Sequence, residues 1–260
     1  MSRLRARCPD CRTLTAVAVE GGYECHSCGR SFAAGLVRVP RAWGTGGEAM
    51  EAAAMLPLPY PETAVVLEDT LSAQTLAVAA ELPERPLVLG GCCCSHIGAV
   101  EALATRHGRL AVVWFDAHGD LNTPATSPSG NEWGMPLRMI IDSETLDPHD
   151  VALVGARALD PPEEQFIGVS GVRLGAESIG AALEGAAAVY VALDVDVLDP
   201  SSTVAAFMPE PDGPTDEEVL FTLERIAASG TPLVGAGISG LGDSPGNAEA
   251  LLPFAHALGL

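Results

Sequence analysis

The sequence contains no lysine: its 14 basic residues are all arginine, and 34 aspartates and glutamates outnumber them. A net charge of −20 repels the phosphates of nucleic acids and anionic membrane surfaces, and it attracts cations such as guanidinium compounds. We therefore expect neither a nucleic acid nor a membrane as a partner. The charge is unevenly spread, because residues 1–41 hold seven arginines and three acids. This basic segment should dock on the acidic remainder of the chain or on a neighbouring subunit.

Long apolar runs are absent as well. No segment approaches the roughly 18 uninterrupted apolar residues of a membrane-spanning helix, and the N-terminus lacks the apolar core of a signal peptide. These absences favour a cytoplasmic protein, in which the seven cysteines would bind metal or act as thiolates rather than form disulfides. The 260 residues, 48% of them hydrophobic, suffice for one large domain with a small appendage.

Two Cys-x-x-Cys pairs near the N-terminus could supply four thiolates to one metal ion: Cys8, Cys11, Cys25 and Cys28. A predicted strand (14–20) and a Gly-Gly hairpin turn join the two pairs. A structural zinc at this spacing would supply the folding free energy that so short a segment cannot obtain from a core. The alternative, a redox Cys-x-x-Cys, normally sits at the start of a helix. We predict a zinc ribbon over residues 1–35, with His26 exposed rather than a ligand.

Beyond residue 35, apolar strands alternate with helical patterns, which predicts an α/β fold: three α/β/α layers around a mostly parallel sheet over residues 36–260. The Pro/Gly-rich passage 40–47 reads as the link into this domain. The predicted strands cover residues 64–67, 86–89, 110–115, 151–154, 189–193 and 233–235, with another near Val172. The predicted helices cover residues 49–55, 71–82, 98–106, 136–141, 176–183, 215–228 and 248–258.

Two local patterns in the last third are assigned structural roles. Thr215 and Glu218 match a capping box at the start of a helix. The glycines at 235, 237 and 240 imitate a dinucleotide-binding fingerprint, but no second strand and helix follow them. We expect no nucleotide there.

The apolar run 111–115 ends in three residues that could converge on one point, Asp116, His118 and Asp120. Alternate residues of an extended segment point to the same side of the chain. Functional groups in an open α/β sheet gather at the carboxyl ends of its strands. The alternative is a strand that ends in a solvated turn.

A second apolar run, 188–193, ends in Asp194 and Asp196. Four carboxylates at the ends of two parallel strands repel one another unless a cation compensates them. Oxygen ligands with one imidazole suit hard or borderline divalent ions, above all Mn(II), and bridging carboxylates could hold two ions.

Three separated motifs resemble the ureohydrolase family of arginase, agmatinase and formiminoglutamase: DAHGD at 116–120, SGNEWG at 129–134 and DVDVLDP at 194–200. The resemblance covers roughly residues 36–260. It implies a metal-dependent amidinohydrolase rather than a peptidase, with two manganese ions whose bridging hydroxide attacks a guanidinium or amidine carbon of a small molecule. It also implies a homo-oligomer.

The resemblance implies roles for individual residues. Asp116 and Asp194 would bridge the ions, Asp120 and Cys93 would complete one, and His118 and Asp196 the other. Asp120 and His118 would be the catalytic residues. Three further residues would lie near the polar end of the substrate: Asn122, Ser129 and Asn131. The alternative role for them is ordinary hydrogen bonding within the loop.

The sequence departs from the family at three positions. Cys93 stands where the family has a ligating His; it could ligate as a softer thiolate, His96 could replace it, or it could only pack, as we expect of the core thiols Cys92 and Cys94. Trp133 replaces a His thought to carry protons, so it would stack on a planar cation or narrow the pocket. Gly240 replaces the Glu that grips a guanidinium in arginases, and Asp243 is the candidate substitute.

Two functions remain open at this point. The first is the metal-dependent hydrolysis of a linear C–N bond in a guanidino or amidino compound. The second is a protein that kept the metal cage without turnover and serves regulation or assembly. A zinc-ribbon nucleic-acid protein fits less well, because the acidic body repels phosphate.

Overall fold

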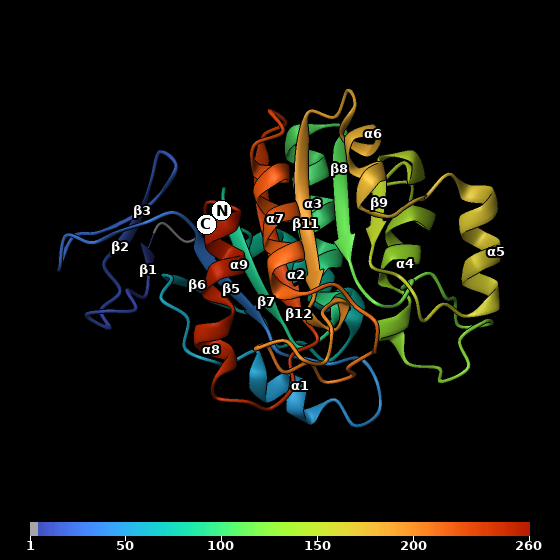
Figure 1. Cartoon of the computed structure of the whole chain (residues 1–260). Helices are drawn as coiled ribbons and strands as arrows, with labels where there is room; N and C mark the ends of the chain where they lie inside the picture. Colours follow the sequence, from blue (N-terminus) through green and yellow to red (C-terminus); the bar gives the residue numbers. More distant parts are fainter. Residues whose placement is uncertain (1–4) are drawn as a thin grey trace.

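The computed structural model describes residues 5–260; the first four residues of the predicted ribbon, with Arg3, lie outside the described residues. The described N-terminal part is a four-stranded antiparallel sheet in the order β1-β2-β3-β4. Its strands are β1 (Arg5–Ala6), β2 (Ala16–Val19), β3 (Gly22–Cys25) and β4 (Ser31–Phe32). This small sheet projects from one side of a much larger body (Figure 1). No helix within residues 5–260 is long and apolar enough to cross a membrane.

The larger body is built on an eight-stranded sheet in the order β10-β9-β8-β11-β12-β7-β5-β6. Every neighbouring pair in it is parallel, as the alternating pattern of the sequence predicts. The strands are β5 (Gly35–Val39), β6 (Glu62–Val65), β7 (Pro86–Gly90), β8 (Leu110–Phe115), β9 (Val151–Val154), β10 (Arg173–Leu174), β11 (Ala188–Asp194) and β12 (Leu233–Ser239).

Helices cover both faces of this sheet, which completes the predicted three layers (Figure 1). Along β8, Ala111, Val113 and Phe115 belong to one core and Val112 and Trp114 to the other, because successive side chains of a strand point to opposite faces. The helices packed on the first core are α6 (Ile179–Leu183), α7 (Asp216–Ala227) and α9 (Leu252–Ala257). Those on the second core are α2 (Leu71–Glu81), α3 (Ile97–His107) and α4 (Pro136–Asp142).

Three features differ from the sequence-based expectation. The body begins with β5, so the passage 40–47 follows the first strand of the large sheet instead of preceding it. A helix that the sequence analysis overlooked, α5 (Pro161–Ser170), begins at a capping box formed by Asp160 and Glu163. The last predicted helix is two short ones, α8 (Asn247–Ala250) and α9, because the ring of Pro253 removes a backbone donor at the start of α9.

The small sheet is joined to the edge of the large one. The backbone N–H groups of Arg7 and Glu62 each donate to the other residue's carbonyl, at 2.9 and 3.0 Å, so β1 lies beside edge strand β6. Arg38, the buried arginine of β5, pairs with Glu62 at 2.8 Å. The small sheet therefore covers part of an edge that would otherwise offer unpaired backbone groups.

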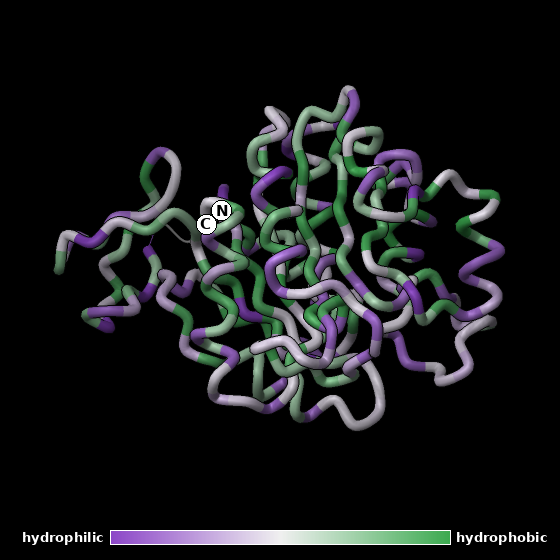
Figure 2. The backbone as a smooth tube through the Cα atoms, viewed as in Figure 1, coloured by the Kyte–Doolittle hydropathy of each residue, from purple (hydrophilic) through white to green (hydrophobic). Residues whose placement is uncertain are grey.

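The carboxyl ends of the parallel strands lie together at one rim, at the bottom of the view in Figure 1. Hydropathy changes along these strands, from apolar in the body of the sheet to polar in the loops beyond it (Figure 2). Polar side chains that follow several different strands can therefore meet at this rim.

Candidate functional site

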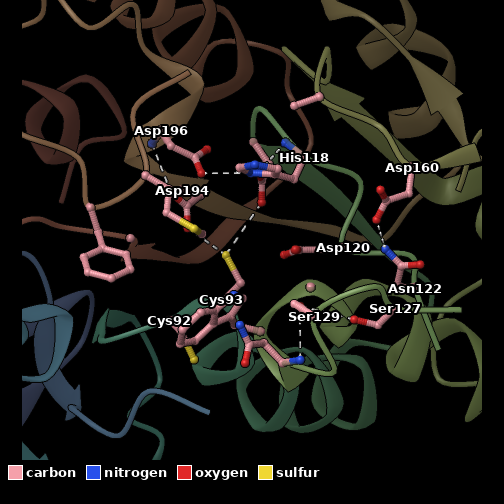
Figure 3. A pocket seen from close by; sticks show the side chains of 18 of the residues that line it. Cys92, Cys93, His118, Asp120, Asn122, Ser127, Ser129, Asp160, Asp194 and Asp196 are labelled. Carbon is pink, nitrogen blue, oxygen red and sulfur yellow. Dashed lines mark hydrogen bonds and ion pairs between the residues drawn. The ribbon is translucent and has the colours of Figure 1, made fainter. Parts of the chain in front are cut away.

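Residues that follow four neighbouring strands meet around one cavity of about 240 Å³ at this rim. Cys93 follows β7 in a 3₁₀ turn, η1 (Cys93–His96). The three polar residues of the DAHGD motif follow β8, Asp194 is the last residue of β11 with Asp196 in the 3₁₀ turn after it, and Gly240 follows β12. Figure 3 shows Cys93, His118, Asp120, Asp194 and Asp196 converging from these elements. The convergence predicted from the two apolar runs is thus present in the fold.

Two groups of possible ligand atoms share Asp116. Cys93, Asp116 and Asp120 form one, and Asp116, His118 and Asp196 form the other; within each group the ligand atoms lie within 4.8 Å of one another. Asp194 belongs to neither group, but its Oδ2 lies 2.9 Å from the Cys93 sulfur. Because one carboxylate serves both groups, the geometry suits two ions held side by side.

Backbone hydrogen bonds fix the carboxylates of this site. The N–H of His118 donates to Asp116 at 2.7 Å, and the N–H of Ala117 donates to Asp196 at 3.0 Å. Asp120 has a φ of 54°, a left-handed conformation that few non-glycine residues adopt. The next N–H, of Leu121, donates to the buried Glu163 at 2.9 Å, so α5 holds the strained loop in place.

Burial and mutual repulsion govern the charges. Burial and the charge of Asp116 raise the pKa of Asp194 to about 6. Burial opposes a charge on His118, but hydrogen bonds and attraction from Asp116 and Asp196 outweigh it and raise its pKa to about 12. Of the described residues that line the cavity, His118 alone can carry a positive charge, and a divalent cation bound to its imidazole would take the place of that proton and relieve the repulsion among the carboxylates.

The donor set fits divalent ions. The Asp120 Oδ2 atom is buried and has no hydrogen-bond partner among the described residues, a costly state unless something else binds it. Carboxylates and one imidazole suit Mn(II), and a thiolate adds a softer ligand to one side only. We therefore regard the residues as able to hold two ions.

The four cysteines of the small sheet also come together. The sulfurs of Cys8 and Cys28 lie 3.7 Å apart, and those of Cys11 and Cys25 lie 3.6 Å apart. Thiolates bound tetrahedrally at about 2.3 Å from zinc are about 3.8 Å from one another. The spacing therefore fits a structural zinc, and His26 is exposed and outside this group, as expected.

Four of the five predicted substrate-binding residues line the cavity, and one does not. Asn122, Ser129, Asn131 and Trp133 line the cavity. Asn122 also donates to Asp160 at 2.8 Å, and Asn131 accepts from the N–H of Thr45 at 3.1 Å, so both have the loop-supporting role as well. Asp243 is exposed and is absent from the residues that line the cavity, so it is left out of the site proposed below.

The Trp133 side chain packs against Gly44, where the lack of a Cβ atom leaves room for the indole ring. A Cβ atom at Gly44 would lie 2.3 Å from the Trp133 ring, so no other residue fits there without displacing the indole. Phe207 meets the same ring edge-on, with 6.3 Å between the centroids. Together they form an aromatic wall on a cavity whose floor is acidic.

Three residues that also line the cavity were not predicted from the sequence: Asp160, Glu163 and Phe207. The first two carried a usable signal, since Asp-x-x-Glu before an apolar stretch is the pattern of a capping box. Phe207 carried none, because it lies in an irregular segment.

The three consecutive cysteines have separate surroundings. The Cys93 thiol donates to Asp194, whereas Cys92 accepts from the N–H of Trp43 at 3.5 Å and Cys94 donates to the Glu132 carbonyl at 3.4 Å. Cys92 and Cys94 are buried, as expected of core thiols. His96 is fully buried and absent from the cavity lining, so Cys93 is the residue that faces the carboxylates.

Comparisons with known proteins point to one family. The model of the arginase family matches residues 48–241. An arginase of Bacillus caldovelox is 37% identical over 168 residues, which are 55% of this chain and 56% of that protein. An arginase of Bacillus subtilis is 33% identical over 183 residues, 61% of this chain and 62% of that one. The sequence matches thus span little more than half the length of these relatives.

The structural likeness is longer. The solved arginase of Bacillus caldovelox superposes with a TM-score of 0.73 at 25% identity, over 86% of this chain and 97% of that one. Proclavaminate amidino hydrolase of Streptomyces clavuligerus superposes with a TM-score of 0.68 at 22% identity, over 86% and 89% of the two chains, which concerns the fold alone. The family match over most of the large body, together with this fold, shows that the chain belongs to the arginase family.

Proposed function

We propose that the chain is a metal-dependent hydrolase of a linear C–N bond in a small guanidino or amidino compound. The observation that carries the proposal is the pair of ligand groups that share Asp116 at the floor of the cavity. The unpartnered oxygen of Asp120 supports it, because that buried atom calls for a bound group.

The proposed ligands of one ion are Cys93, Asp116, Asp120 and Asp194, and those of the other are Asp116, His118, Asp194 and Asp196. Two divalent ions, at least one of them of the manganese type, would supply Lewis acidity and a water molecule whose pKa is lowered toward neutrality. Asp120 would accept a hydrogen bond from that water and so orient it. The Nδ1 atom of His118 lies 3.3 Å from Asp116 and 3.0 Å from Asp196, so this nitrogen would share an ion with the two carboxylates.

The cavity favours a cation as substrate. Six acidic side chains line it, and within the described part of the chain no arginine does: Asp116, Asp120, Asp160, Glu163, Asp194 and Asp196. Trp133 lines the same cavity, and the face of its indole would attract a planar cation bound there. Indole cannot shuttle protons at neutral pH, so we assign Trp133 to binding and shaping the pocket.

The test combines metal analysis with turnover. Purified protein should contain two divalent ions per chain beyond the ribbon's metal, and should release urea or ammonia from at least one of a panel of guanidino and amidino compounds. Asp120→Ala should abolish that release. Asp69→Ala, a change at an exposed aspartate outside the cavity lining, is the matched control and should retain it.

Two results would count against the proposal. Fewer than one divalent ion per large body would remove its chemical basis. Full metal occupancy without turnover on any compound of the panel would instead favour a metal-binding protein with a regulatory or assembly role. Trp133 and Gly240, which replace a His and a Glu of the family, would then explain the lack of turnover.

We also propose a structural zinc in the ribbon, held by the four cysteines that lie within 4.8 Å of one another. Homo-oligomerisation and a cytoplasmic location remain predictions. Light scattering of the purified protein tests the first, and a mass of one chain would contradict it.

A further inference from the structure

Three polar side chains form a row behind Cys93, away from the cavity. Ser239, His96 and Tyr190 are each fully buried. The Ser239 hydroxyl lies 3.2 Å from the Cys93 sulfur and 3.3 Å from the Asp194 carboxylate. Buried polar groups destabilise a core unless they are hydrogen-bonded, so a row of three calls for an explanation.

The row is continuous. His96 Nε2 lies 3.1 Å from the Ser239 hydroxyl, and its Nδ1 lies 3.0 Å from the Tyr190 hydroxyl. A Cβ atom at Gly237 would lie 2.4 Å from that hydroxyl and 2.5 Å from Nδ1, so only glycine leaves room for the contact. Trp114 meets the His96 ring edge-on at 5.3 Å and closes the other side.

The direction of the protons follows from the partners. Within residues 5–260, His96 is the one hydrogen-bond partner of the Tyr190 hydroxyl, so Tyr190 must donate or bury an unpaired hydrogen. Burial lowers the pKa of His96 to about 3, so its ring is neutral and has one donor and one acceptor. Nδ1 therefore accepts from Tyr190, and Nε2–H donates to Ser239.

This arrangement leaves the Ser239 hydrogen free to point at the metal cluster. With Nε2–H as its donor, the Ser239 oxygen is an acceptor toward His96, and its own O–H can donate only to Cys93 or Asp194. In this structure the Cys93 thiol donates to Asp194 at 2.9 Å. If a cation bound the sulfur, the thiol proton would be released to solvent through the cavity, and Ser239 would remain as the donor to the thiolate.

We propose that Ser239, His96 and Tyr190 are positioning residues for a Cys93 thiolate ligand, which makes the Cys93 half of the metal pair a zinc- or iron-type position while the His118 half stays manganese-type. The inference rests on the proposed two-ion site. Its physical reason is that thiolates prefer softer ions than carboxylates do, and only one of the two groups contains sulfur. Hydrogen bonds from an outer layer then hold the ligand and tune its affinity.

The first test is displacement of manganese by zinc. Protein with zinc already in the ribbon is loaded with Mn²⁺, and Zn²⁺ is titrated in while retained manganese is measured. The wild type should lose its first manganese at a zinc concentration about 10- to 100-fold lower than Cys93→His, which replaces sulfur by imidazole. Cys94→Ser, a change at the neighbouring buried thiol, should behave as the wild type.

The same titration tests the row. Ser239→Ala should raise the required zinc concentration by about tenfold, and Tyr190→Phe should raise it by less. If Tyr190 acts through Ser239, its effect should vanish in the Ser239→Ala background. Tyr60→Phe is the matched control, because it removes another buried tyrosine hydroxyl, one that donates to the Leu260 carbonyl far from Cys93.

Cobalt gives a direct view of the sulfur. The absorption spectrum of Co²⁺-loaded Cys93→Ser is subtracted from that of the Co²⁺-loaded wild type, so that the contribution of the ribbon cysteines cancels. The difference spectrum should contain a near-ultraviolet thiolate-to-cobalt absorption band. Ser239→Ala should shift this band to longer wavelength, because a hydrogen bond to sulfur lowers the energy of its donor electrons.

The outcomes separate this inference from the proposed function. A flat difference spectrum with two ions still bound would overturn thiolate ligation and leave the hydrolase proposal intact. A band that Ser239→Ala and Tyr190→Phe move no more than Tyr60→Phe does would overturn the positioning row. Failure of turnover alone affects neither readout.

Discussion

Residues 5–260 contain two clusters of possible metal ligands, and they are built in opposite ways. The ribbon gathers four identical side chains from a short stretch, and its most distant contacting pair, Cys8 and Cys28, is separated by 20 positions. The cluster in the cavity joins residues as far apart as Cys93 and Asp194, which are separated by 101 positions. The first cluster is local in sequence, whereas the second is created by the sheet.

The difference in surroundings is equally large. The buried apolar residues of the ribbon are few: Ala6, Cys8, Ala16, Tyr23 and Cys25. The cavity cluster stands at the end of a sheet covered by two extensive cores. A bound ion would therefore supply much of the ribbon's folding free energy, whereas the packing of the large body is extensive enough to hold the fold without an ion.

Removing the ribbon's ion should have the largest effect of all. Structural zinc contributes about 10–16 kcal/mol to folding in small zinc domains, far more than the ribbon's few buried side chains could replace. Cys25→Ser should therefore abolish amide protection in β2 and β3, measured by hydrogen exchange, while β8 and β11 stay protected. Cys94→Ser should leave both regions protected. Persistent protection of β2 in Cys25→Ser would show that the ribbon folds without its metal ion.

Asp116→Asn should disrupt the metal-ligand cluster of the cavity while the large body and the ribbon stay folded. It removes the carboxylate shared by both groups, so both ions should be lost and kcat/KM should fall by at least on the order of 10³-fold. Metal analysis and turnover check this result, with Asp69→Asn as the control. Retention of both ions would show that Asp116 is not shared. Hydrogen exchange of the ribbon should be unchanged.

Trp133→Ala should have a moderate effect confined to substrate binding. Loss of a contact between a cation and the indole raises KM by about 3- to 30-fold, with a smaller change in kcat. Steady-state kinetics on the best substrate of the panel measure the split. Phe221→Ala removes an exposed aromatic ring of α7 and should change neither constant. A fall in kcat alone would instead assign Trp133 to the chemical step.

Thr215→Ala should have the smallest effect and touch neither cluster. The Thr215 hydroxyl accepts from the N–H of Glu218 at 3.3 Å, and loss of such a cap lowers the free energy of unfolding by about 1 kcal/mol. Urea denaturation of the large body measures the change. Thr222→Ala, within the same helix, should be nearly neutral. A change in metal content would show that α7 is coupled to the cavity.

Much of the large body follows from sequence periodicity alone. Buried runs such as 110–115 and 151–154 are continuous and apolar, as strands covered on both faces require, and the structure reproduces these two as β8 and β9. β5 was overlooked because it directly follows the ribbon and contains Arg38, a charged residue inside a buried strand. Its partner Glu62 comes from β6, a pairing that no local pattern reveals.

The cavity residues also divide into those that the sequence reveals and those that only the fold brings together. Alternating acids after an apolar run are visible in the chain, so Asp116, His118, Asp120, Asp194 and Asp196 could be named in advance. Their meeting depends on β8 and β11 being neighbours in the sheet. Asp160, 40 positions beyond Asp120, enters the lining through the loop before α5, and only the fold brings it there.

By itself the sequence determined the alternation of strands and helices, the acids that end two buried strands and the four cysteines of the ribbon, because each is a property of neighbouring residues. Only the tertiary structure decided that Cys93 rather than His96 faces the carboxylates, that Asp243 stays outside the cavity, and that Ser239, His96 and Tyr190 stand in one row. Those choices depend on which strands lie side by side and which way their side chains point, and parallel strands are paired across long stretches of chain that no local pattern spans.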